Sequence, residues 1–66
     1  MRDPNTKTFH HALEEVVKII TSGESGIVIG RAEHQNTNDQ YLIEYKAADG
    51  RAVQEWWFEN QTQKIA

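Results

Sequence analysis

The sequence contains no cysteine, only one proline and no long hydrophobic run. Without cysteine, the chain can form neither a disulfide nor a zinc site with thiolate ligands. Its apolar runs fall short of the roughly 18 residues that a membrane-spanning helix needs. No apolar signal region is present near Met1, so we expect a cytoplasmic protein.

The chain is also short, with 66 residues and only 38% hydrophobic residues. We expect one domain over residues 1–66, with residues 1–7 loose. A core of this size rarely contributes more than roughly 3–5 kcal/mol to stability, and small domains add disulfides, metals or oligomerisation. Since disulfides are excluded, the sequence favours a homo-oligomer.

Positive charge is scarce, because seven Lys and Arg residues stand against ten Asp and Glu residues, for a net charge of −3. This balance argues against nucleic acid as the main partner, because phosphate binding needs cations. Nucleic-acid binding remains an alternative on a face that joins aromatic and basic residues: Tyr41, Tyr45, Arg31, Lys46 and Arg51. Interleaved glutamates would repel phosphate there: Glu33, Glu44, Glu55 and Glu59.

The N-terminal part of the chain has two possible structures. Asp3 and Pro4 are suited to the N-cap and first position of a helix. Apolar residues at helical spacing then favour one helix over residues 8–21 packed on a three-stranded sheet. The β-branched residues after Glu15 favour a strand instead. We therefore predict a short helical segment over residues 8–14 and a strand over residues 16–21.

The remainder of the chain is typical of strands joined by polar loops. Strands are expected over residues 27–33, 41–47 and 51–59, followed by a short closing segment over residues 60–66. Polar clusters at 22–26 and 35–39 mark loops. Alternation in the third strand places four residues on its core face: Tyr41, Ile43, Tyr45 and Ala47.

Three glycines carry specific predictions. Asp49-Gly50 indicates a hairpin with a type I′ turn, which requires positive φ at both central residues and therefore at Gly50. Gly26 and Gly30 are four residues apart, so they should share one face of their strand and mark a bend or a close backbone approach. Short strands with such corners predict an all-β, SH3-like small barrel of four to five strands with a short helical N-terminal segment.

The run Trp56-Trp57-Phe58 is the most informative feature of the sequence. Successive side chains of a strand point to opposite faces, so only one tryptophan can enter the core. The set Ala52, Gln54, Trp56 and Phe58 is the more apolar, which predicts that it faces the core. Trp57, with Val53 and Glu55, should then lie outside as a partner or subunit interface. Alternatively, the N-terminal segment covers this outer ring.

No constellation of catalytic residues stands out. His10 and His11 are adjacent and point in different directions on a helix or a strand, and His34 lies in a loop, so we predict no metal site. The loop over residues 22–26 lacks the Gly-Lys-Ser/Thr of a phosphate-binding loop. We predict no catalytic residues, no cofactor, and a non-catalytic binding or assembly module.

Residues 16–54 resemble the plasmid-encoded type II dihydrofolate reductases, a family of SH3-like barrels. The resemblance rests on Val16 and Lys18, on Gly26-Ile27-Val28-Ile29-Gly30, on Tyr41, Glu44, Ala47 and Gly50, and, after one inserted residue, on Val53-Gln54. It implies a homotetramer around one central pore, lined by Val53 and Gln54, with Lys18 near the mouth to attract anionic ligands. The sequence also looks like small SH3-like proteins of phages and other mobile elements.

The sequence departs from the reductase pattern at the two following pore positions. Glu55 replaces an isoleucine and Trp56 replaces a tyrosine. Fourfold repetition of Glu55 around one pore would repel an anionic nicotinamide cofactor and an anionic folate. The resemblance therefore implies the fold and self-association, and a homotetrameric reductase is kept as the alternative function.

Overall fold

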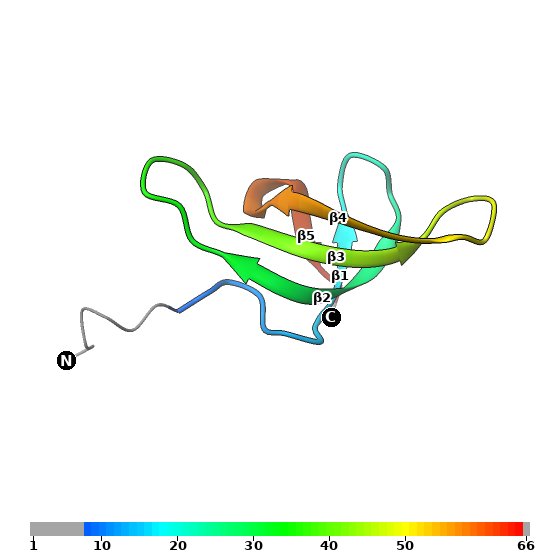
Figure 1. Ribbon diagram of the computed structural model, residues 1–66, viewed down its shortest axis with the longest axis horizontal. Coiled ribbons are helices and arrows are strands. Elements are labelled where there is room, and N and C mark those ends of the chain that lie inside the picture. The colour runs from blue at the N-terminus through cyan, green and yellow to red at the C-terminus, as the bar shows by residue number, and fades with distance from the viewer. Residues whose placement is uncertain (1–7, 66) are drawn as a thin grey trace.

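The computed structural model describes residues 8–65, which form one antiparallel sheet of five strands (Figure 1). The all-β prediction is therefore confirmed. A short 3₁₀ turn, η1 (Glu59–Gln61), joins the last two strands. The strands are β1 (Val16–Ile19), β2 (Ser25–Ala32), β3 (Gln40–Lys46), β4 (Ala52–Phe58) and β5 (Thr62–Lys64).

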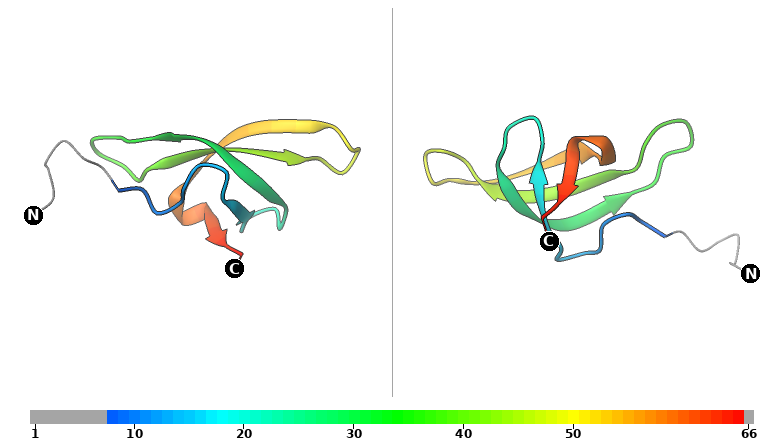
Figure 2. Two further views of the ribbon diagram at one scale, coloured as in Figure 1. Left: turned by 90° about the horizontal axis from the view of Figure 1, so that it is seen from below. Right: turned by 180° about the vertical axis from the view of Figure 1, so that it is seen from behind.

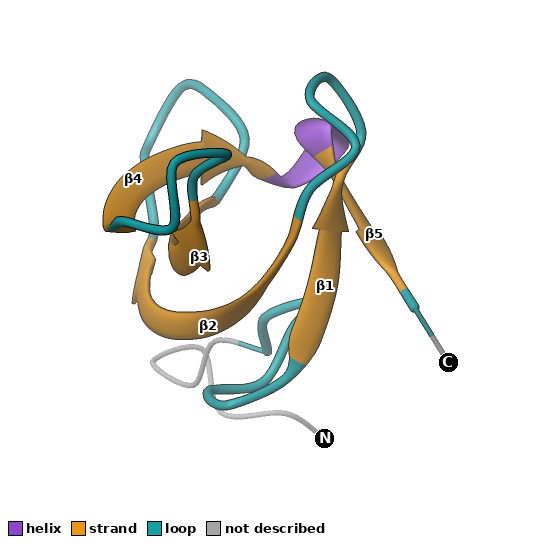
Figure 3. Cartoon of the chain, turned by 90° about the vertical axis from the view of Figure 1, so that its right-hand side faces the viewer, coloured by secondary structure: helices purple, strands orange, loops and turns teal. Residues whose placement is uncertain are grey.

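The strands follow the order β4-β3-β2-β1-β5 across the sheet. The first four strands therefore form a simple meander, and η1 returns the chain so that β5 pairs with the far side of β1. β2 bends between its two neighbours, so that the sheet curls (Figures 2 and 3). β4 and β5 remain the two edges of this open sheet.

The predicted N-terminal helix is wrong for the part of the chain that the structure describes. Residues 8–15 form bends and a turn with no α-helix, and Asp3 and Pro4 lie outside the described residues. The backbone N–H groups of His10 and His11 donate to the hydroxyl of Tyr41 at 2.9 and 3.3 Å. The segment therefore finds its hydrogen-bond partners in distant strands rather than within a helix.

The alternative single helix over residues 8–21 is wrong as well, because β1 begins at Val16 as the strand prediction required. β1 ends at Ile19, two residues earlier than predicted, and a turn follows. Gly23, with φ of 79°, closes that turn by donating its N–H to the carbonyl of Ile19 at 2.7 Å. The positive φ explains why glycine occupies this position.

A small core lies on the inner face of the curled sheet. Tyr41 and Ile43 of β3 are fully buried there and Tyr45 packs against them, which confirms the predicted core face of this strand. Ala47 lies one residue beyond β3 and is half-buried. The fully buried apolar residues are Val17, Ile19, Val28, Tyr41 and Ile43, with Phe9, Tyr45 and Trp57 packed against them.

The prediction that Gly26 and Gly30 share one face is wrong, because the register of β2 against β3 shifts between Val28 and Gly30. Gly26 lies on the inner face, where a Cβ would come within 2.5 Å of the Glu44 carbonyl oxygen. Gly30 lies opposite Leu42 on the other face. A β-bulge inserts one residue and so reverses the alternation beyond it.

The hairpin at Asp49-Gly50 is confirmed, with Gly50 at φ 86°. Its turn differs from the predicted type I′ turn, because Asp49 does not have positive φ. The N–H of Gly50 donates to the carbonyl of Ala47 at 2.9 Å, and the N–H of Ala47 donates to the carbonyl of Arg51 at 2.8 Å. The loop thus has three residues, and only the last requires the left-handed conformation.

Candidate functional site

The two tryptophans of β4 face opposite ways, and the predicted assignment of their faces is wrong. Trp57 lies opposite Tyr41, half-buried and packed against the core, whereas Trp56 lies opposite Leu42 and is 48% exposed. The pairing with β3 decides the assignment, because the buried face of β3 contains Tyr41. Counting apolar residues along β4 alone could not include this constraint.

The predicted interface residues Val53, Glu55 and Trp57 therefore lie on the inner face of the sheet, opposite Tyr45, Ile43 and Tyr41. Glu55 is exposed near the open edge, where its carboxylate accepts a hydrogen bond of 3.0 Å from the Tyr45 hydroxyl. Burial is the main cause that raises the pKa of Tyr45, and the hydrogen bond to Glu55 and the negative charge of Glu55 raise it further.

The opposite side of the sheet carries an apolar surface that includes Trp56, which the sequence analysis placed in the core. We call the following residues the outer face: Val16, Lys18, Ile27, Leu42, Glu44, Lys46, Gln54 and Trp56. Val16, Ile27 and Trp56 are each between 45% and 49% exposed. A shallow groove of about 480 Å³ crosses this side, with Val16, Ile27 and Ala52 among its lining residues.

Strand register aligns the outer face into cross-strand rows. One row contains Val16, Ile27, Glu44 and Gln54 of four successive strands, and the Gln54 side-chain amide donates to the Glu44 carboxylate at 2.8 Å. The next row contains Gly30, Leu42 and Trp56, and the Trp56 side chain extends across Leu42 toward Gly30. A Cβ on Gly30 would lie 3.6 Å from the edge of the Trp56 ring. The outer face therefore presents aliphatic and aromatic surface beside one satisfied polar pair.

The residues suggested by the reductase resemblance are divided between the two faces. Lys18 and Gln54 are exposed on the outer face together with Trp56, whereas Val53 lies on the inner face. Glu55, which was expected to line the same pore, also lies on the inner face. The strand alternation thus separates Glu55 from Lys18 and Gln54.

The predicted aromatic and basic face for nucleic acid does not form as one surface. Tyr41 is fully buried and cannot stack on a base. Arg31 places its guanidinium 4.8 Å from the ring centre of Phe9 on the inner side, and Lys46 belongs to the outer face. The acidic residues remain exposed or half-buried around them.

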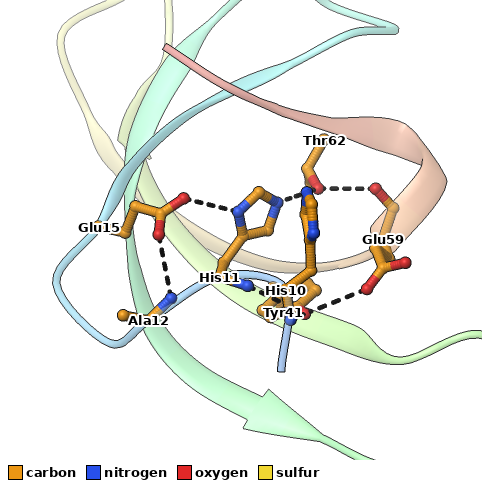
Figure 4. A network of polar contacts seen from close by, with 7 residues as sticks. All are labelled: His10, His11, Ala12, Glu15, Tyr41, Glu59 and Thr62. Atoms are coloured by element: carbon orange, nitrogen blue, oxygen red, sulfur yellow. Dashed lines mark hydrogen bonds and ion pairs between the residues drawn. The ribbon is translucent and has the colours of Figure 1, made fainter. Parts of the chain in front are cut away.

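A buried polar network joins the N-terminal segment to the end of the chain (Figure 4). His11 is fully buried, and its Nδ1 lies 2.7 Å from a carboxylate oxygen of Glu15. Its Nε2 lies 2.9 Å from the hydroxyl of Thr62, which in turn donates to the carbonyl oxygen of Glu59 at 2.8 Å. Thr62 lies 51 residues from His11 along the chain, and no feature of the sequence predicted this contact.

The order of hydroxyl, imidazole and carboxylate in this network resembles a proton relay. Its hydroxyl, however, belongs to a residue that is only 8% exposed, and it is already engaged by Glu59. Tyr41 completes the network, because its hydroxyl accepts from two backbone N–H groups and donates to Glu59 at 3.4 Å. Burial raises the pKa of Tyr41, so this hydroxyl remains protonated. The arrangement fastens segments together rather than presenting a nucleophile.

A polar cleft of about 620 Å³ lies beside the network, between residues 8–10 and the loop that precedes β3. His10 and His34 line it, and His34 contacts Gln40 at 2.7 Å. Within residues 8–65, no group of three or more His, Asp or Glu side chains is placed to hold a metal ion.

Comparisons of the chain with known protein families, curated proteins and solved structures find no match. Within residues 8–65, no helix has the length and apolar character needed to cross a membrane.

Proposed function

We propose that this chain is a non-catalytic, self-associating assembly module of the SH3-like small-barrel class, in which the outer faces of two copies pack together. The observation that carries this proposal is the exposure of Val16, Ile27 and Trp56 on one side of the sheet. Contiguous apolar surface on a small protein marks an interaction site, and tryptophan is a favoured interface anchor.

The charges favour a second copy of the chain as the partner. The net charge of −3 makes two copies repel each other over most orientations. The outer face differs from the chain as a whole, because it carries Lys18 and Lys46 against the single carboxylate of Glu44. A two-fold interface must be complementary to itself, and a face with apolar rows and both signs of charge meets that requirement.

The connectivity supports the assignment to the small-barrel class. A four-stranded meander is followed by a 3₁₀ turn, which returns a short fifth strand to the side of β1. The curl of the sheet around one small core fits the same class (Figure 3). In a chain of this size, association through the outer face would add buried apolar surface that the monomer lacks.

Sedimentation equilibrium at micromolar concentration tests the proposal with two matched variants. Ile27→Lys places a charge at the centre of the outer face. Leu13→Lys places the same charge outside the sheet, at a residue of similar exposure: Leu13 is 50% exposed and Ile27 is 45% exposed. We expect the wild type and Leu13→Lys to sediment as multiples of 7.6 kDa and Ile27→Lys as a monomer. A monomeric wild type contradicts self-association, and equal disruption by both variants contradicts the outer face as its site.

One observation favours the reductase as a second candidate function. Lys18 and Gln54 share the outer face, while Glu55 lies on the other side of the sheet. A pore built from the outer face would therefore be free of the four Glu55 carboxylates, and its own carboxylate, that of Glu44, accepts a hydrogen bond from Gln54. Dihydrofolate-dependent oxidation of a reduced nicotinamide cofactor by the purified protein tests this candidate, and a rate equal to the protein-free background rejects it.

A further inference from the structure

The two edges of the sheet differ in how well they are protected against pairing with another strand (Figure 1). β5 has only three residues and ends in Lys64, and both shortness and lysine discourage pairing at an edge. β4 has seven residues, contains neither lysine nor proline, and pairs with β3 without a shift of register. β4 is therefore the edge that can accept a further strand.

Backbone hydrogen bonds beyond both ends of β4 determine which of its amides point away from β3. The N–H of Ala47 donates to the carbonyl of Arg51, and the N–H of Glu59 donates to the carbonyl of Asp39. In an antiparallel ladder, hydrogen-bonded pairs alternate with pairs that are not hydrogen-bonded. The β4 residues whose backbone N–H and C=O groups point away from β3 are then Ala52, Gln54, Trp56 and Phe58.

One of these outward groups is already engaged within the chain. The N–H of Phe58 donates to the side-chain oxygen of Gln61 at 2.9 Å. The other three residues have exposed side chains, and their outward N–H groups have no hydrogen-bond partner among residues 8–65. Ala52, Gln54 and Trp56 are therefore three alternate positions at which a new strand can form hydrogen bonds, and we call them the open positions of β4.

We propose that β4 pairs antiparallel with β4 of a second copy, across a two-fold axis at Gln54, so that the two sheets become one. In this register Gln54 lies opposite its counterpart, and Ala52 lies opposite Trp56 of the second copy. Each such pair exchanges two backbone hydrogen bonds, so every open position finds a partner. Registers centred on the neighbouring residues leave Ala52 or Trp56 without an open position opposite.

The side chains make this register complementary to itself, which favours a second copy over an unrelated strand. On the outer side the large Trp56 lies beside the small Ala52, at the end of the groove that Ala52 helps to line. This contact covers part of a ring that is 48% exposed in the single chain. On the inner side Glu55 lies opposite Val53. A register centred on Glu55 would instead place two carboxylates directly opposite each other, which is destabilising.

The edge contact is distinct from the outer-face contact of the proposed function. Ile27 of β2 lies two strands away from the β4 edge, so a chain can bind one copy through each surface. Assemblies larger than a pair then follow. The edge buries little apolar surface apart from Trp56, so we expect it to be the weaker contact. Ile27→Lys should therefore still be a monomer at micromolar concentration and pair through β4 only at higher concentration.

Amide hydrogen exchange of Ile27→Lys tests the edge contact without a contribution from the outer face. The N–H groups at odd-numbered positions of β4 face β3 and should be protected at every concentration. Those at the open positions should exchange freely at micromolar concentration. Near millimolar concentration they should exchange about tenfold more slowly once about nine-tenths of the edges are paired, because exchange then occurs only from the unpaired remainder.

Two results of this measurement overturn the proposal. Fast exchange at the open positions up to millimolar concentration means that no second copy occupies the edge. Protection that is the same at micromolar and millimolar concentration means that a segment of the same chain occupies it. Neither result bears on the outer face, because that contact is tested by sedimentation of the wild type at micromolar concentration.

Two substitutions of Gln54 in the Ile27→Lys protein separate the backbone from the side chain. Gln54→Ala removes the side chain and its bond to Glu44 but keeps the N–H. Gln54→Pro also removes the N–H, which points away from β3, so the chain should still fold. We expect concentration-dependent protection of Ala52 and Trp56 in Gln54→Ala and none in Gln54→Pro. Equal behaviour of the two folded variants overturns the proposal, and the exchange of Ile27→Lys itself requires neither of them.

Discussion

At the scale of single residues, two glycines are required for different physical reasons. A Cβ at Gly26 would lie 2.6 Å from a methyl carbon of Ile43 and closer still to the β3 backbone, so space excludes a side chain there. At Gly50 nothing lies within 4 Å of such a Cβ, and only the positive φ disfavours other residues. The requirement for positive φ at Gly50 could be predicted from the dipeptide Asp49-Gly50. The lack of space at Gly26 could not, because it depends on how β2 pairs with β3.

Gly50→Val should lower the free energy of unfolding by at least about 1–2 kcal/mol, because a β-branched residue is strained at positive φ. Gly50→Asn is the matched control, since asparagine tolerates this conformation and meets no steric obstacle. Urea denaturation of the three proteins measures both changes. Equal losses in the two variants would show that backbone conformation is not the cause.

Glu14 shows the same conformation in a residue that is not glycine, with φ of 70°. Its N–H donates to the carbonyl of Val28 at 2.7 Å, and the N–H of Val28 donates to the carbonyl of Glu15 at 2.9 Å. These bonds tie the N-terminal segment to β2 and hold the strained residue in place. Such long-range partners explain why local helical spacing failed to predict this segment.

At the scale of elements, alternation predicted that β4 has two different faces but could not determine which one is buried. That choice depends on β3, where Tyr41 pairs with Trp57 and Leu42 with Trp56. β3 itself was assigned correctly because Tyr41, Ile43 and Tyr45 share one face, whereas the other face contains the charged Glu44 and Lys46. β4 has an aromatic residue on both faces and a glutamate on the inner one, so its composition indicated the wrong side.

Replacing each tryptophan by alanine should therefore have effects of different kinds. Trp57→Ala removes a ring packed on the core and should cost roughly 3–5 kcal/mol, which is enough to unfold so small a domain. The loss is moderated because the indole N–H of Trp57 is buried with no hydrogen-bond partner among residues 8–65. Trp56→Ala should leave the fold intact and weaken self-association.

Circular dichroism on thermal unfolding measures the first effect, and sedimentation of the folded variant measures the second. An unfolded Trp56→Ala protein beside a stable Trp57→Ala protein would contradict the orientation of β4. A folded Trp56→Ala variant that associates as strongly as the wild type would remove that ring from the proposed interface.

The polar network at His11 lay largely beyond the reach of sequence reasoning. The spacing of His11 and Glu15, four residues apart, is visible in the chain. Thr62, the hydrogen-bond partner of the other His11 ring nitrogen, comes close only because η1 turns the chain back to β1. A contact made by the closing strand of the sheet has no local signature.

At the scale of the whole molecule, stability and association should be coupled. Among residues 8–65, five fully buried apolar side chains make a small core, while three apolar residues of comparable size, Val16, Ile27 and Trp56, stay near half exposed on the outer face. A partner that binds only the folded state stabilises it by mass action. The unfolding temperature of the wild type should therefore depend on protein concentration.

For a dimer well above its dissociation constant, a tenfold increase in concentration adds about 1.4 kcal/mol per dimer to the free energy of unfolding. Divided between two small domains, this should raise the melting temperature by roughly three to six degrees. Ile27→Lys should abolish the concentration dependence and leave the monomer folded, because Ile27 packs on the solvent side of the sheet rather than in the core. Calorimetric scans across a hundredfold range of concentration measure both effects. A wild-type melting temperature that stays constant over that range would mean that the outer face is not covered by a second copy.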